Sequence, residues 1–218
     1  MCFSATANFV TAAITGVAGV AALIRINRRE EIVLAATPLI FAAQQSLEGL
    51  LWMTLPIVRE GSGTASLTSA FLLVAKVCWP VVAPLATMLI EPDKHQRRMM
   101  AVCLAMGVAV AIYFLWSILG HSIGSNIVNG HIVYSGEPEP PLPIKIAYFA
   151  AVGLAAALSS FLTLRLFAII VLSGALITYF LYWEAFSSVW CFFAAAASAV
   201  IILHFEQVRQ GLPVAVGR

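Results

Sequence analysis

Long apolar runs separated by short polar segments dominate this sequence. Seven runs have roughly the 20 residues that a helix needs to cross the hydrocarbon core of a bilayer. They cover residues 3–24, 32–55, 67–90, 99–119, 144–161, 164–183 and 186–205, and the longest polar segment, 120–143, follows the fourth run. The pattern predicts an all-α membrane protein, a seven-transmembrane helix bundle that forms a single domain over residues 1–218.

Composition agrees with the pattern. Hydrophobic residues make up 61% of the chain and charged residues only 10%, whereas soluble domains carry about 25% charged residues. The lipid bilayer is therefore the expected partner. Basic residues lie in short clusters between the apolar runs rather than in a tail or stripe, which argues against nucleic-acid binding. The N-terminus lacks the basic region of a cleaved signal peptide, so we expect the first helix to be retained.

Lysine and arginine in short loops indicate orientation, because they are enriched on the cytoplasmic side. One side of the predicted bundle receives only Arg59 and Lys145. The other side receives Arg25, Arg28, Arg29, Lys94, Arg97, Arg98, Arg165, Arg209 and Arg218. We therefore expect a multi-pass protein of the cell membrane with a cytoplasmic C-terminus, and with the N-terminus and segment 120–143 extracytoplasmic. This segment is rich in Gly, Asn and Pro and predicts an irregular surface cover.

Polar side chains interrupt the second apolar run. Gln44, Glu48 and Trp52 recur every four residues and so share one helix face, with Gln45 beside them. A carboxylate at this depth is costly in lipid and indicates a functional site with a partner. The expected partner is Lys76, in the next run at a similar depth.

The predicted ligand-binding set adds two tryptophans that lie deeper than an interfacial belt. Its members are Gln44, Gln45, Glu48, Trp52, Lys76, Trp79 and Trp190. A purely structural alternative stays open, in which Glu48 and Lys76 only fasten two helices together.

Cys2 and Cys191 are both expected near the outer end of the bundle. They could form a disulfide or a redox pair. The four cysteines show no CxxC or zinc-like spacing, so no metal site is expected. The residues do not identify a cofactor.

Four segments carry a family resemblance: MCFSATANF, AAQQSLEGLLW, KVCWPVVAPLA and SSVWCFF. They resemble an uncharacterised family of small polytopic membrane proteins that begin Met-Cys-Phe-Ser-Ala-Thr. Because that family has no assigned activity, the resemblance implies no chemistry. The positions it marks are Cys2, Phe3, Ser4, Gln44, Gln45, Glu48, Gly49, Trp52, Trp79, Pro80 and Cys191.

Three functions are compatible with these residues. The first is an intramembrane site that binds or conducts a small polar ligand or ion. The second is an accessory subunit of a membrane complex or a homo-oligomer, with the small-residue segments 155–160 and 194–199 as packing faces. The third is an intramembrane enzyme that uses Glu48 as a base with a cysteine thiol. A retinal photoreceptor is disfavoured because the seventh run has no lysine.

Overall fold

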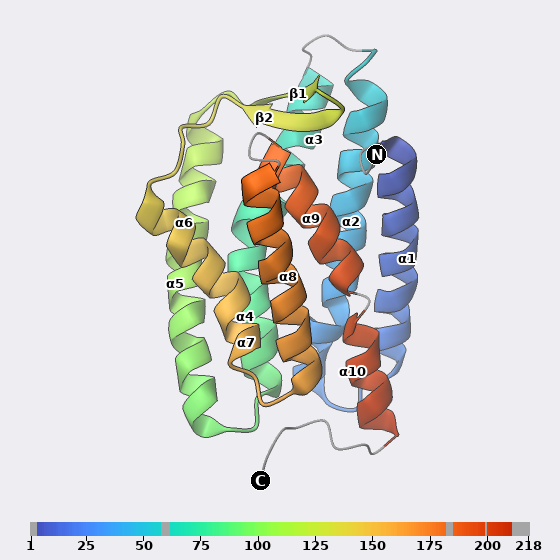
Figure 1. Cartoon of the computed structure of the whole chain (residues 1–218), viewed down its shortest axis with the longest axis vertical. Helices are drawn as coiled ribbons and strands as arrows, with labels where there is room; N and C mark the ends of the chain where they lie inside the picture. The colour runs from blue at the N-terminus through green and yellow to red at the C-terminus, as the bar shows by residue number, and fades with distance from the viewer. Residues whose placement is uncertain (1–3, 58–61, 182–184, 199, 211–218) are drawn as a thin grey trace.

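The computed structural model describes residues 4–57, 62–181, 185–198 and 200–210 (Figure 1). Within these ranges the chain is mostly helical, which confirms the coarse prediction of a helical bundle. In chain order the elements are α1 (Ala5–Ile24), α2 (Ile32–Thr54), α3 (Ser62–Leu72), α4 (Trp79–Ile90), α5 (Lys94–Gly120), β1 (Gly124–Val128), β2 (His131–Ser135), α6 (Leu142–Phe149), α7 (Ala155–Ala157), α8 (Leu162–Leu181), α9 (Phe186–Ser198) and α10 (Val200–Arg209).

The helices run along the long axis of the molecule, and the two strands lie across one end (Figure 1). A π-helical segment, Leu73–Cys78, joins α3 to α4, and a second, Ala150–Leu154, joins α6 to α7. Five of the resulting helices are long and apolar enough to cross a membrane: Ala5–Ile24, Gly63–Ile90, Lys94–Gly120, Leu162–Leu181 and Phe186–Arg209. Leu142–Ala157 is apolar but shorter.

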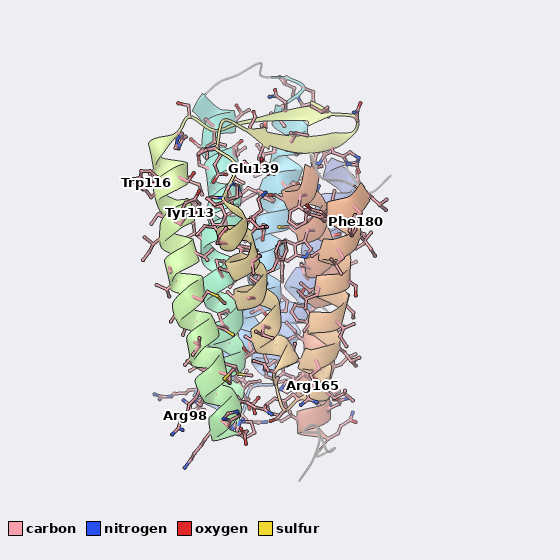
Figure 2. All side chains as sticks on the ribbon, turned by 60° about the vertical axis from the view of Figure 1, so that its left-hand side comes forward. Arg98, Tyr113, Trp116, Glu139, Arg165 and Phe180 are labelled. Carbon is pink, nitrogen blue, oxygen red and sulfur yellow. The ribbon has the colours of Figure 1, made fainter. Side chains whose placement is uncertain are left out.

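Large apolar side chains cover the outside of the bundle. Trp116 on α5 is 70% exposed and Phe180 on α8 is 77% exposed, and they lie on opposite sides in Figure 2. Val17 on α1 is 71% exposed. A soluble monomer rarely exposes apolar surface on several faces. This surface is compatible with membrane association.

Pro80 explains the first π-helical segment. Proline lacks the N–H that would bond to the carbonyl four residues earlier, and its ring crowds that carbonyl. The helix widens there, and the Trp79 N–H bonds to the carbonyl of Val74, five residues back. A second helix uses the altered backbone, since the Tyr148 hydroxyl donates to the Ala75 carbonyl at 2.5 Å.

Two helices begin about five residues before the predicted limits. α5 begins at Lys94 rather than residue 99, because Asp93 caps it by accepting from the Gln96 N–H at 2.8 Å. α3 begins at Ser62 rather than residue 67. Apolar runs mark the stretches that suit lipid, whereas polar residues can extend a helix beyond them.

The expectation that segment 120–143 is irregular was wrong for residues 124–135. Strands β1 and β2 form an antiparallel hairpin in which Val128 pairs with His131. The two turn residues, Asn129 and Gly130, have φ values of 50° and 75°. Two consecutive left-handed residues make the type I′ turn that matches the twist of a hairpin, and Asn-Gly is its strongest sequence signal.

The hairpin is anchored to the end of the bundle. Ile132 is fully buried, and the Tyr134 ring stacks on Phe71 of α3 with centroids 4.9 Å apart. Ser125 of β1 shares a 2.7 Å hydrogen bond with Thr68 of α3. The hairpin is therefore packed against α3 by both apolar and polar contacts.

Helices α4 and α5 approach most closely at Gly107. A Cβ at this position would lie 1.8 Å from the Pro80 carbonyl oxygen, so Gly107→Ala should lower the free energy of unfolding by about 1–3 kcal/mol. Gly120→Ala is the matched control on the same helix, because a Cβ there meets nothing within 4 Å. Thermal unfolding of the purified variants measures both effects. Equal melting temperatures for the two variants would contradict this close approach.

Candidate functional site

Three polar side chains of α2 lie in the interior of the bundle. Gln44 and Gln45 are fully buried, and Glu48 is 1% exposed. Helix α2 packs against α1, α3, α4 and α9, and Figure 1 shows it between α1 and α9. The neighbouring helices therefore exclude lipid and bulk solvent from this face.

Gln44 connects α2 to α4. Its Oε1 accepts a hydrogen bond from the Trp79 indole N–H at 2.7 Å. The Trp79 ring stacks on Phe41 with centroids 3.9 Å apart, and the Gln44 side chain also lies beside the Cys191 thiol of α9. Gln44 thus lies next to Trp79, another member of the predicted ligand-binding set, and next to Cys191.

Glu48 faces two hydroxyl groups that the sequence analysis did not select. Tyr134 of the hairpin and Ser188 of α9 both lie beside its carboxylate. Neither hydroxyl oxygen has a well-formed hydrogen bond among the described residues, and Glu48 Oε1 also lacks one. The hairpin, α2 and α9 thus bring three incompletely bonded polar groups together.

Lys76 is the main correction to the predicted site. Its ammonium pairs with Glu137, which follows β2, rather than with Glu48. The ammonium also lies 5.3 Å from the centre of the Phe114 ring on α5. The prediction relied on similar depth in the bundle, and depth does not determine the direction in which a side chain leaves its helix.

Two other buried carboxylates in the described structure are well satisfied. Glu31 accepts from the backbone of Asn27 at 2.8 Å and from the Arg28 guanidinium at 3.1 Å. Burial alone would raise the pKa of Glu31, but these hydrogen bonds outweigh it and lower the pKa. Glu91 accepts from the Ser160 N–H at 2.9 Å and from the Ser159 hydroxyl at 3.1 Å. Both link chain segments near the turns, as structural carboxylates do.

Unsatisfied polar atoms concentrate around Glu48. Folded proteins leave only a few buried polar groups unpaired per 100 residues, and each one needs an explanation. We use the name Glu48 cluster for Gln44, Gln45, Glu48, Trp52, Tyr134 and Ser188. Among the described residues, these have no hydrogen-bond partner for Gln44 Nε2, both polar atoms of Gln45, Glu48 Oε1, Trp52 Nε1, the Tyr134 hydroxyl and Ser188 Oγ.

Helix α1 adds one more polar group at this level. Added Cβ atoms at Gly49 and Gly19 would meet Phe9 and Leu39, and one at Gly16 would meet Ala42. In all three pairs the two residue numbers have the same sum, so α1 and α2 pack antiparallel in one constant register. The register places Asn8 within about one helical turn of Glu48. Asn8 is 2% exposed and its Oδ1 has no partner among the described residues.

An apolar cavity of about 40 Å³ lies next to the cluster. Phe41, Trp79, Trp190 and Cys191 line it on the side of the Glu48 cluster, and its lining extends to Leu34, Ala86, Leu164 and Ile201. Its volume suits one or two water-sized molecules. Trp190 belongs to this apolar region rather than to the cluster, since its indole N–H donates to the Val171 carbonyl at 3.0 Å.

The structure describes two of the three remaining predicted residues, Trp52 and Cys191, but not Cys2. Trp52 lies in the cluster with an unpaired indole N–H among the described residues. Cys191 is buried and forms no disulfide with another described cysteine. Cys2 lies outside the described residues, so the pairing of the two stays a prediction. Sequence reasoning missed Tyr134, although the Asn-Gly turn and the alternation of Ile132 with Tyr134 could have indicated a strand with both side chains on its inner face.

Residues 1–215 match the family of unknown function DUF6629. The chain belongs to this family. The predicted membership of an uncharacterised family is therefore confirmed over nearly the whole chain. No curated protein and no solved structure matches the chain. Membership supplies no activity, so the functional argument depends on the geometry of the Glu48 cluster.

The ion pair between Lys76 and Glu137 should hold the hairpin over the cluster. Glu137→Gln removes one charge and leaves Lys76 only 20% exposed without its counter-charge, so we expect amide hydrogen exchange in β1 and β2 to accelerate by about tenfold or more. Hydrogen-exchange mass spectrometry measures this rate.

Glu139→Gln is the matched control for this measurement. Glu139 pairs with Lys145, but its side chain is 71% exposed, and exposed ion pairs contribute little to stability. Exchange in the strands should then match that of the wild-type protein. If Glu137→Gln leaves exchange unchanged as well, the pair does not secure the hairpin.

Proposed function

We propose that this protein is a multi-pass protein of the cell membrane that binds a small polar ligand or ion in the Glu48 cluster. The observation that carries the proposal is the concentration of unpaired, fully buried polar atoms around one carboxylate. The hairpin serves as the cover on the extracytoplasmic side. Binding supplies the missing partners for these atoms.

The distribution of basic residues supports this orientation. Arg98 and Arg165 lie at the end of the bundle opposite the hairpin (Figure 2). Arg25 bonds there to Glu206 of α10 at 3.1 Å, close to the end of the last described helix. Because cytoplasmic loops are enriched in Lys and Arg, this end is assigned to the cytoplasm and the hairpin to the exterior.

The free-energy cost of unpaired buried polar groups favours a ligand-binding role for the Glu48 cluster over a purely structural one. A buried polar group left without a hydrogen bond lowers stability by about 1–3 kcal/mol, and a carboxylate without a counter-charge lowers it further. Polar groups that only hold two helices together stabilise the protein only when they hydrogen-bond to each other. Glu31 and Glu91 have such bonds at 2.8–2.9 Å. Glu48 Oε1 has no well-formed hydrogen bond among the described residues, although the Ser188 and Tyr134 hydroxyls lie beside the carboxylate.

The surroundings favour binding rather than conduction. The cavity next to the cluster continues along the bundle between side chains such as Leu34, Ala86 and Ile201. An ion would lose its hydration in this apolar region without gaining replacement ligands. Access from the hairpin side is the more favourable route for a polar ligand.

An accessory subunit is a weaker alternative, because most of the described small residues expected to form its packing faces are buried. Ala155 and Ala195 are fully buried, and Ala156, Ala194 and Ala197 are 4–6% exposed. These small residues pack inside the bundle, whereas Ala157 is half-buried and Ala196 is exposed. An enzyme stays a further alternative. Of its two candidate thiols, Cys191 is only 4% exposed and Cys2 lies outside the described residues.

A double variant, Gln45→Leu with Glu48→Met, tests the proposal. Replacing unpaired polar groups by apolar ones of similar size should leave the melting temperature of the ligand-free protein unchanged or raise it. Wild-type protein should be stabilised by at least one member of a panel of NaCl, KCl, glycine, betaine and glucose, and the variant should lose that response. Scanning fluorimetry in lipid nanodiscs measures both effects.

Glu91→Met is the control for this experiment. It removes a carboxylate with several hydrogen bonds, so it should lower the melting temperature without changing any response to the panel. If the double variant is destabilised as strongly as Glu91→Met, the Glu48 cluster is a structural fastening. That result would overturn the proposed function.

A further inference from the structure

Three of the unpaired atoms of the Glu48 cluster are N–H nitrogens, on Gln44, Gln45 and Trp52, and its four unpaired acceptors are oxygen atoms. They comprise the carboxylate Oε1 of Glu48, the amide Oε1 of Gln45 and the hydroxyl oxygens of Tyr134 and Ser188. Carboxylate, amide carbonyl and hydroxyl oxygens are the ligands that hard cations prefer. The donor chemistry therefore fits a hard metal cation.

Several elements direct these oxygens to one region. Gln45 and Glu48 are three residues apart on α2, so their side chains are neighbours on one helix face. Ser188 of α9 and Tyr134 of β2 both lie beside the Glu48 carboxylate. The three elements could surround an ion from different directions, as a coordination sphere requires.

The charge of the cluster selects a monovalent ion. Glu48 is its one carboxylate, and Lys76, the cation expected to pair with it, is neutralised by Glu137 instead. A monovalent cation would bring the buried charge of the cluster to zero. A divalent cation would leave an excess positive charge in a region of low dielectric constant, which is strongly unfavourable.

The cavity next to the cluster is not lined by the four oxygen-bearing residues, so an ion bound by them would have to be small and without its water shell. The cavity next to the cluster is lined by Trp79 and Cys191, while Gln45, Glu48 and Ser188 are not among its lining residues. Glu48 and Ser188 are each 1% exposed. An organic ammonium ion or a hydrated ion would require more room between these side chains.

We propose that the Glu48 cluster is a sodium-binding site, in which Glu48, Gln45, Ser188 and Tyr134 supply oxygen ligands to a dehydrated Na⁺. This inference rests on the proposed function and names the ligand class of the same site. Tyr134 belongs to the hairpin that is held by the Lys76–Glu137 pair. Na⁺ binding would therefore also favour the closed position of the hairpin.

A titration of NaCl against N-methylglucamine chloride tests the site at constant ionic strength. We expect Na⁺ to raise the melting temperature of the wild-type protein in nanodiscs by about 5 °C at saturation, because it binds only the folded state. KCl should have a weaker effect at equal concentration. Binding of radioactive ²²Na⁺ gives a second measurement that does not depend on unfolding.

Ser188→Ala and Tyr134→Phe each remove one ligand oxygen. Each substitution should raise by about tenfold or more the Na⁺ concentration that gives half of the maximal rise in melting temperature. Ser198→Ala is the matched control on α9, because Ser198 is equally buried but its hydroxyl donates to the Ala195 carbonyl at 2.6 Å. Its response to Na⁺ should equal that of wild type.

The outcomes separate the two proposals. If Na⁺ gives no specific stabilisation or binding, but glycine, betaine, glucose or KCl acts in a Glu48-dependent manner, the sodium site is wrong and the proposed function stands. If no panel member acts on wild type, both proposals are wrong. An equal loss of Na⁺ response in Ser188→Ala and Ser198→Ala would also overturn the assigned ligand set.

Discussion

A carboxylate buried without a fixed counter-charge is the feature on which the hairpin end of this protein depends. Glu48 lies on a helix enclosed by other helices, so water cannot solvate it freely. Its surroundings consist of hydroxyl and amide groups rather than a lysine or arginine. Such an arrangement is unfavourable for an isolated protein. It becomes favourable once a ligand supplies the missing interactions.

At the opposite end of the bundle, buried carboxylates have hydrogen-bond donors from the protein itself. Glu31 is bonded within its own turn, and Glu91 links the turn before α5 to the segment between α7 and α8. Both carboxylates gain N–H or O–H donors from chain segments that have left regular helix. Turns offer such free donors. The middle of α2 does not, because its backbone groups are occupied by the helix itself.

The segments that indicated the family also have local structural roles. Ser4 caps α1 by accepting from the Ala7 N–H at 3.2 Å, and Gly49 leaves room for the Phe9 ring. Trp79 donates to Gln44, while Pro80 widens the preceding turn and contacts α5 through its carbonyl. These residues position α1, α2, α4 and α5 around one region. The family motif thus describes a packing arrangement as well as a set of polar groups.

The sequence by itself determined the number of helices, their approximate limits and the buried polar face of α2, because apolar runs and helical spacing are local properties. It also contained the Asn129-Gly130 signal for the hairpin. Only the tertiary structure decided that Lys76 pairs with Glu137, and that Tyr134 and Ser188 complete the surroundings of Glu48. These contacts join segments far apart in the chain, and the side-chain directions that create them depend on how the helices and hairpin pack.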